Sequence, residues 1–209
     1  MIDDLSEAAL LERYRSGQTD AFEALVRRHQ GPLLRHAQGL LGPGSSAEDV
    51  VQEAFLKLAQ QPPTLPAEVL GDARTERAAL ASWLHKVTRN LCMDLLRSES
   101  RRKRREHEVA PGEAAKGELE HVDLNDTQEA VGRSLERLPQ DQREVLVLRL
   151  LGEKSYKEIA AITGKKVGTV GWLVSVGLKA LASELAPLLG GAPGDDSRAS
   201  GLTPIRGEL

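Results

Sequence analysis

The feature that most constrains the fold is a helix-turn-helix pattern in the C-terminal half of the chain. Ser155 and Glu158 have the spacing of a capping box, in which the hydroxyl and the carboxylate accept hydrogen bonds from free backbone amides at the start of a helix. Ile159 begins the apolar face of this short helix, and Gly164 can take the left-handed conformation that ends it. A second helix is predicted to begin near Val167. In units of this kind the second helix enters the major groove of DNA.

Composition favours small helical domains. Of the 209 residues only 3% are aromatic, whereas Leu, Ala and Val are abundant. A chain of this length suits one large or two small domains, and its aliphatic side chains suit helix packing better than a sandwich or a barrel. We therefore expect an all-α protein with two small helical domains joined by a flexible linker.

The charge, the cysteine content and the hydropathy argue against a general polyanion binder, a disulfide-stabilised fold and a membrane-spanning or secreted protein. The net charge is −3, so any contact with nucleic acid must come from a local basic patch and not from the whole surface. The single cysteine, Cys92, cannot form an internal disulfide. No apolar run approaches the roughly 18 residues that span a membrane, and the acidic N-terminus lacks a signal-peptide core. These features predict a protein of the reducing cytoplasm without membrane insertion.

Shifts in composition predict the domain boundaries. Residues 1–108 are interpreted as one helical block and residues 126–186 as a second. Residues 109–125 hold few large apolar side chains, so they cannot form a core and are predicted to be a linker. Residues 187–209 are rich in Gly, Pro, Asp and Ser, which predicts a disordered tail.

An acidic helix is predicted in residues 47–60. Its apolar side chains recur at the spacing of one helix face and are expected to point to a core; they are Val51, Ala54, Phe55 and Leu58. Asp49, Gln52 and Glu53 share the outer face. Charge on an exposed face, taken alone, usually indicates only solvation.

The next predicted helix, residues 81–105, is strongly basic. Its Lys and Arg residues outnumber the acidic ones by eight to two. Leu84 and Leu91 belong to an apolar stripe, which leaves the polar side chains on outer faces where they can follow a phosphate backbone. The candidate DNA-binding residues of this helix are Lys86, Arg89, Asn90, Arg97, Arg101, Arg102, Lys103, Arg104 and Arg105. For the last five the alternative is a solvated tail.

The acidic helix, the basic helix and the helix-turn-helix, in this order, resemble the bacterial RNA polymerase sigma factors of the extracytoplasmic-function (ECF) type, a branch of the sigma-seventy family. The segments that carry the resemblance are residues 16–58, 81–105 and 138–170, about half of the chain. The resemblance implies a first domain that docks on core RNA polymerase and binds the −10 promoter element as it opens. It implies a second domain that contacts the −35 element.

The same resemblance implies roles for particular residues. Asp49, Gln52 and Glu53 would contact a basic coiled coil of the largest polymerase subunit. The basic helix would bind the −10 element with help from the loop of residues 60–77, in which the sequence does not identify the residue that captures a base. In the helix-turn-helix, the residues expected to reach DNA are Lys165, Lys166 and Thr169.

The second helix of the helix-turn-helix departs from the pattern of this family. Where members carry Lys, Ser and Arg after Val-Gly-Thr-Val, this chain has mostly apolar residues and glycine. If Val170 and Val174 face the core, Trp172, Leu173 and Val176 are expected on the opposite side. That side lacks the Arg, Lys, Asn and Gln that read base edges, so direct base readout is the least favoured interpretation.

Two interpretations of these apolar residues remain open. In the first, the side chains are buried against the chain itself, for example under Leu188 and Leu189. In the second, Trp172, Leu173 and Val176 form an exposed patch that binds a protein, such as an anti-sigma factor, an activator or a second copy.

No pattern of a catalytic or cofactor site is present. The five histidines and Cys92 lack metal-ligand spacing, and neither a phosphate-binding Gly loop nor a Ser-centred elbow is found. We expect no enzyme and no cofactor. The favoured function is a transcription initiation factor whose partners are core RNA polymerase and promoter DNA. The alternative is a sigma-derived interaction protein that docks on polymerase or a regulator without selecting promoters.

Overall fold

The computed structural model of the chain describes residues 2–42, 46–109 and 126–186, apart from the side chains of residues 103 and 106–130. Within these ranges every regular element is a helix, which confirms the all-α prediction. The elements are η1 (Ile2–Asp4), α1 (Glu7–Arg15), α2 (Thr19–Leu41), α3 (Ala47–Gln60), η2 (Ala67–Val69), α4 (Ala73–Val109), α5 (Asp126–Arg137), α6 (Gln140–Leu150), α7 (Tyr156–Thr163) and α8 (Val167–Leu185). None of the helices in these ranges is long and apolar enough to cross a membrane. The predicted linker, apart from Val109, and the predicted tail lie outside the described residues.

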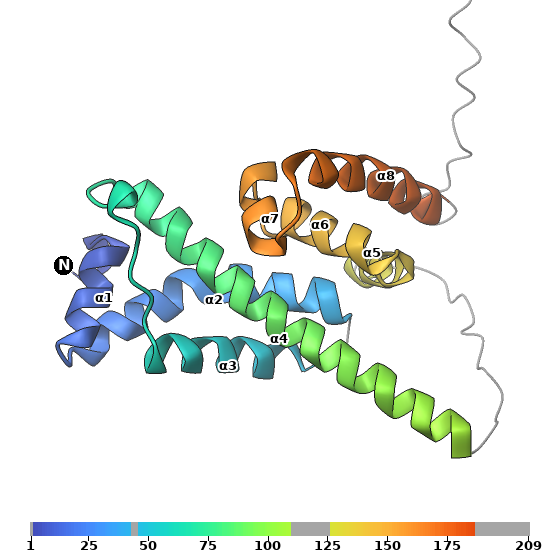
Figure 1. The fold of residues 1–209 in the computed structure, drawn as a ribbon, viewed down its shortest axis with the longest axis horizontal. Helices are drawn as coiled ribbons and strands as arrows, with labels where there is room; N and C mark the ends of the chain where they lie inside the picture. The colour runs from blue at the N-terminus through green and yellow to red at the C-terminus, as the bar shows by residue number, and fades with distance from the viewer. Residues whose placement is uncertain (1, 43–45, 110–125, 187–209) are drawn as a thin grey trace, which may run out of the picture.

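Helices α1 to α4 form the first helical block, in which α2 packs against α1, α3 and α4 (Figure 1). Its core holds fully buried leucines from all four helices, among them Leu10, Leu25, Leu58 and Leu84. The buried carboxylate of Glu76 accepts hydrogen bonds from the amides of Ala8 and Gly71 at 3.0 and 2.9 Å. These bonds tie α1 and the loop before α4 to the first turn of α4.

Helix α4 is one continuous helix of 37 residues that contains the whole predicted basic segment. Its first half packs in the core through Leu80, Leu84 and Cys92. From Arg97 onward every described side chain of α4 is exposed, and this end of the helix projects beyond the other helices (Figure 1). The same helix therefore closes the core and carries basic side chains into solvent.

Helices α5 to α8 form the second helical block and include the predicted helix-turn-helix. Ser155 Oγ accepts a hydrogen bond from the amide of Glu158 at 3.3 Å, and the Glu158 carboxylate accepts one from the amide of Ser155 at 2.8 Å. Gly164 ends α7 with a φ of 73°, in the left-handed region. The capping box and the glycine turn are both confirmed.

The two blocks pack against each other, which the sequence did not predict. Helix α6 lies on α2, and α7 lies on α4 (Figure 1). A Cβ on Gly39 of α2 would lie 2.8 Å from both γ-carbons of Val147, so only glycine permits this approach of α6. Arg143 of α6 donates to the carbonyl of Leu40 at 3.2 Å, and Arg35 of α2 donates to the carbonyl of Leu151 at 3.5 Å.

A pair of buried histidines lies between α2 and α4. The Nδ1 atoms of His36 and His85 are 3.1 Å apart, so one ring donates a hydrogen bond to the other. Burial is the main cause that lowers the pKa of His36 to about 3, and the charges of Lys154 and Arg89 lower it further. Burial likewise lowers the pKa of His85 to about 2, with added effects from His36 and Lys154. Both rings are therefore neutral at pH 7.

The histidine pair predicts that the protein loses stability in mild acid. The unfolded chain takes up a proton on each ring near the ordinary pKa of 6.5, whereas the folded chain resists protonation down to pH 3. The contribution of the two neutral rings to the free energy of unfolding is thus complete above about pH 6.5. As the pH falls below this value, the free energy of unfolding decreases by about 1.4 kcal/mol per pH unit for each ring. Urea unfolding at pH 7.5, 6 and 5 should record this slope.

His36→Gln is the matched variant, and it should reduce that slope by about half, whatever it does to the stability at pH 7.5. A free energy of unfolding that stays constant between pH 7 and pH 5 in the unmodified chain would contradict the prediction.

Candidate docking and nucleic-acid surfaces

The outer face of α3 carries the residues predicted to contact polymerase. Asp49, Gln52 and Glu53 are exposed, and the predicted core residues of the same helix are buried. Glu53 lies 3.7 Å from the ammonium of Lys57 one turn on, an exposed pair that contributes little to stability. Leu56, which the sequence analysis did not single out, is 47% exposed on the same face, at helical spacing from Gln52 and Glu53. This surface combines carboxylates with an exposed apolar side chain.

The projecting end of α4 carries a row of guanidinium groups. Arg97, Arg101 and Arg105 follow one another at four-residue spacing, and the Nε of each donates to the carbonyl of the residue four positions earlier, at 3.1 to 3.3 Å. These bonds hold the stems along the helix axis and leave other N–H groups of each fork free to face a ligand. Arg97 also pairs with Asp94 at 3.0 Å. Lys86, Asn90, Arg102 and Arg104 are exposed on the same helix, while the side chain of Lys103 lies outside the described set.

The prediction that Arg89 lies on an outer face of α4 is wrong. Its guanidinium forms an ion pair with the carboxylate of Glu144 on α6, at the contact between the two blocks. Glu144 is buried, and a buried carboxylate without a partner would be strongly destabilising. The helical spacing of α4 gave no sign of this, because a part of its polar face is covered by a segment more than 50 residues away. In this arrangement Arg89 faces the second block and not DNA.

Helix α8 has the inner face that its periodicity predicts. Val170, Val174, Gly177 and Leu181 are all buried. A Cβ on Gly177 would lie 3.0 Å from a methyl carbon of Leu146, so the glycine lets α8 approach α6 closely. Close packing against α6 thus stabilises a segment whose glycines and valines are poor helix formers.

Trp172, Leu173 and Val176 do not form one patch. Trp172 is 62% exposed, whereas Leu173 is only 5% exposed and Val176 is half-buried. Because neighbouring residues on a helix differ by about 100°, Leu173 turns inward beside Val174. The prediction that Leu173 lies on the outer face is wrong. Leu188 and Leu189, named above as a cover, lie outside the described residues.

The polar residues before and within α8 are not equally accessible. Lys166 and Thr169 are exposed, and Thr169 is one turn before Trp172 on the outer face. The ammonium of Lys165 pairs with the carboxylate of Asp141 on α6 at 2.9 Å, and its side chain is largely buried. Of the three candidates at this end of α8, Lys166 and Thr169 are therefore the accessible ones.

The opposite burial of Trp172 and Leu173 predicts opposite effects of mutation. Leu173→Ala should lower the free energy of unfolding of the full chain by about 2 to 4 kcal/mol, because it leaves a cavity beneath α8. Trp172→Ala should change it by about 0.5 kcal/mol or less, since most of the ring is already in water. Urea unfolding followed by circular dichroism measures both. Equal losses in the two variants would contradict the orientation of α8.

The chain matches two family models, described as Sigma-70 region 2 over residues 25–102 and Sigma-70, region 4 over residues 128–181. It is 32% identical to the ECF RNA polymerase sigma factor SigM of Mycobacterium tuberculosis over 165 residues, which are 79% of this chain and 77% of that protein. It is 29% identical to the ECF RNA polymerase sigma-E factor of Escherichia coli over 199 residues, which are 90% of this chain and 99% of that protein.

Two solved structures have a similar fold. The sigma factor RpoE of Bartonella quintana, in complex with the anti-sigma factor NepR, has a TM-score of 0.54 and 27% identity over 74% of this chain and 90% of that one. CnrH, in complex with the cytosolic domain of CnrY, has a TM-score of 0.59 and 24% identity over 87% of this chain and 97% of that one. Both family models fall on the two helical blocks, the first on α2 to α4 and the second on α5 to α8. The chain therefore belongs to the extracytoplasmic-function sigma factors of the sigma-70 family, transcription initiation factors that bind core RNA polymerase and direct it to specific promoters.

Proposed function

We propose that α3 docks this sigma factor on core RNA polymerase while α4 holds the −10 region of the promoter. The observation that carries the proposal is the placement of an acidic and a basic surface on two helices that pack directly on each other. Polymerase and DNA would then be held by one helical core, so their relative position is set by the packing of α3 on α4.

The α3 surface suits a basic helical partner. Asp49 and Glu53 can pair with Lys or Arg, and Gln52 can donate and accept hydrogen bonds. Leu56 adds an exposed apolar side chain beside Asp49 and Glu53. A few such groups on a well-packed helix give a defined orientation, because α3 does not need to order itself on binding.

The row of guanidinium groups on α4 suits a phosphate backbone. Four-residue spacing places Arg97, Arg101 and Arg105 about 6 Å apart along the helix axis. Lys86 and Asn90 continue the exposed polar face toward the N-terminus of α4. Arg89 joins them only if the second block moves and releases it from Glu144. We therefore propose that promoter binding requires the two blocks to separate.

The outer face of α8 suits a protein partner better than base readout. Trp172 and Val176 are apolar, and Lys166 and Thr169 are limited to contacts near the helix start. The similar sigma factor RpoE was solved in complex with the anti-sigma factor NepR. We propose that Trp172 and Val176 belong to the surface on which an anti-sigma factor binds this chain.

The proposed role is positional and not catalytic. Among the described residues no group of three or more His, Cys, Asp or Glu side chains is placed to hold a metal ion. We place the protein in the cytoplasm, where core polymerase and promoter DNA are found.

The proposed function predicts that core polymerase supplied with this chain gives promoter-specific transcripts, whose start sites sequencing identifies.

Docking through α3 predicts that charge reversal on this helix weakens core binding. Asp49→Lys with Glu53→Lys should weaken core binding by about 2 kcal/mol or more, because like charges would then face each other. Glu12→Lys with Glu23→Lys is the matched control, since both residues are exposed on other helices and each pairs with a nearby arginine. Unchanged affinity in the α3 variant would remove α3 from the interface.

The basic row predicts a change in salt dependence. Arg101→Gln with Arg105→Gln should lower the slope of log affinity against log salt for holoenzyme on promoter DNA by about two, one for each phosphate contact. Core binding should stay the same. Arg13→Gln, an exposed arginine of α1, should leave the slope unchanged. A slope equal to that of the unmodified protein would mean that the end of α4 is only a solvated tail.

A further inference from the structure

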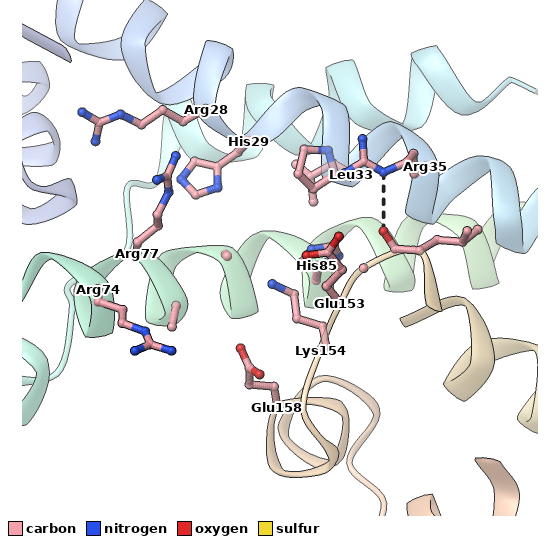
Figure 2. A pocket seen from close by; sticks show the side chains of 15 residues that line it. Arg28, His29, Leu33, Arg35, Arg74, Arg77, His85, Glu153, Lys154 and Glu158 are labelled. Carbon is pink, nitrogen blue, oxygen red and sulfur yellow. Dashed lines mark hydrogen bonds between the residues drawn. The ribbon is translucent and has the colours of Figure 1, made fainter. Parts of the chain in front are cut away.

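An open cavity of about 470 Å³ lies between the two helical blocks (Figure 2). Its walls come from the middle of α2, the first turns of α4 and the turn between α6 and α7. The charged residues that line it are Arg28, Arg35, Arg74, Arg77, Lys154, Glu153 and Glu158. Five are cationic and two are acidic, so the cavity attracts anions although the whole chain is acidic.

Some of these cations already have partners. Arg28 pairs with Glu7 at 3.2 Å and donates to two backbone carbonyls. The same oxygen of Glu7 lies 3.7 Å from Arg77, so one carboxylate serves two guanidinium groups. Arg35 donates to the carbonyl of Leu151. These contacts hold the arginine stems in place but leave part of the positive charge unbalanced.

Arg74 and Lys154 form no such ion pair. No carboxylate of the described residues lies within ion-pair distance of either side chain, and Figure 2 shows both pointing into the space between α4 and the α6–α7 turn. The acidic neighbour Glu158 is already occupied as the capping group of Ser155. Burial lowers the pKa of Lys154, and the charges of Glu158 and Glu153 oppose this effect only in part.

One further feature of the cavity wall supports a ligand. Glu153, next to Lys154, has a φ of 54°, the one positive value at a non-glycine residue in the described ranges. Sparsely populated backbone conformations of this kind cluster where proteins bind ligands.

We propose that this cavity binds a small anion with two or more phosphoryl groups, of nucleotide size, and that the ligand bridges the two helical blocks. Guanidinium groups bind phosphate through paired hydrogen bonds, and Lys154 adds a point charge from the opposite wall. Pro32, Leu33 and Ala81 give the cavity an apolar side against which the organic part of a nucleotide can pack. Because Arg74 belongs to the first block and Lys154 to the second, the ligand favours the arrangement in which Arg89 is held by Glu144.

The test is calorimetric titration of the full chain in the absence of polymerase and DNA. The probes are pyrophosphate, ATP and GTP, with sulfate at equal ionic strength as the comparison. We expect saturable binding of the phosphorylated probes, at least about tenfold tighter than that of sulfate, because a ligand with several phosphoryl groups can contact cations on both walls of the cavity. Absence of saturable binding at millimolar concentration, or equal affinity for sulfate, would overturn the proposal. Neither result bears on polymerase docking, which this assay does not involve.

Three variants localise the binding. Arg74→Gln and Lys154→Gln should each weaken the affinity for the phosphorylated probes by about tenfold or more, whereas Lys157→Gln, an exposed lysine of α7 outside the cavity, should change it by about twofold or less. Circular dichroism melting checks that each variant folds. Equal losses in all three variants would indicate bulk electrostatics and overturn the site, and a loss in only one cavity variant would contradict bridging. Binding of a short single-stranded oligonucleotide through Arg74 and Lys154, without binding of the small phosphates, would assign these cations to DNA. This result would also overturn the proposal of a small-anion site.

Discussion

The packing of α4 on α2 is the contact on which the rest of the molecule depends. It buries the first half of α4 through Leu80 and Leu84, and it places His85 against His36 in a position where neither ring can take up a proton at pH 7. Because α4 is continuous, this contact also sets the direction of the basic row at its far end. Most of the stability of a helix in a protein comes from tertiary packing of one face, so burial of the first half of α4 supports the exposed half that carries the basic row.

The second block shows how packing decides which residues of a helix remain available. Gly177 lets α8 approach Leu146, and on the same helix Leu173 is buried while Trp172 remains in water. A basic recognition helix would present a row of charges at the same positions. Here the surface has one large aromatic ring, which favours contact with another protein because such rings contribute much area at little entropic cost.

The contact between the blocks links the functional surfaces to one another. Glu144 neutralises Arg89, a residue of the α4 polar face, and Lys154 of the α6–α7 turn lines the same open cavity as Arg74 of α4. Any ligand or partner with unequal affinity for the closed and the separated arrangement will shift the balance between them. Promoter DNA is proposed to favour separation, whereas a small polyanion in the cavity is proposed to favour closure.

The sequence by itself determined the local structure and the family. The capping box at Ser155, the turn at Gly164 and the spacing of Val51, Phe55 and Leu58 depend only on residues within a few positions of one another, so their periodicity was sufficient to predict them. The contact between the blocks, the loss of Arg89 from the outer face and the cavity around Lys154 were decided by the tertiary structure alone. Each of these joins residues that are far apart in the chain, such as Gly39 and Val147, and no local pattern records which distant helix will cover a polar face. The inward turn of Leu173 has the same cause, because the width of the buried stripe on α8 is set by how α5, α6 and α7 together pack on it.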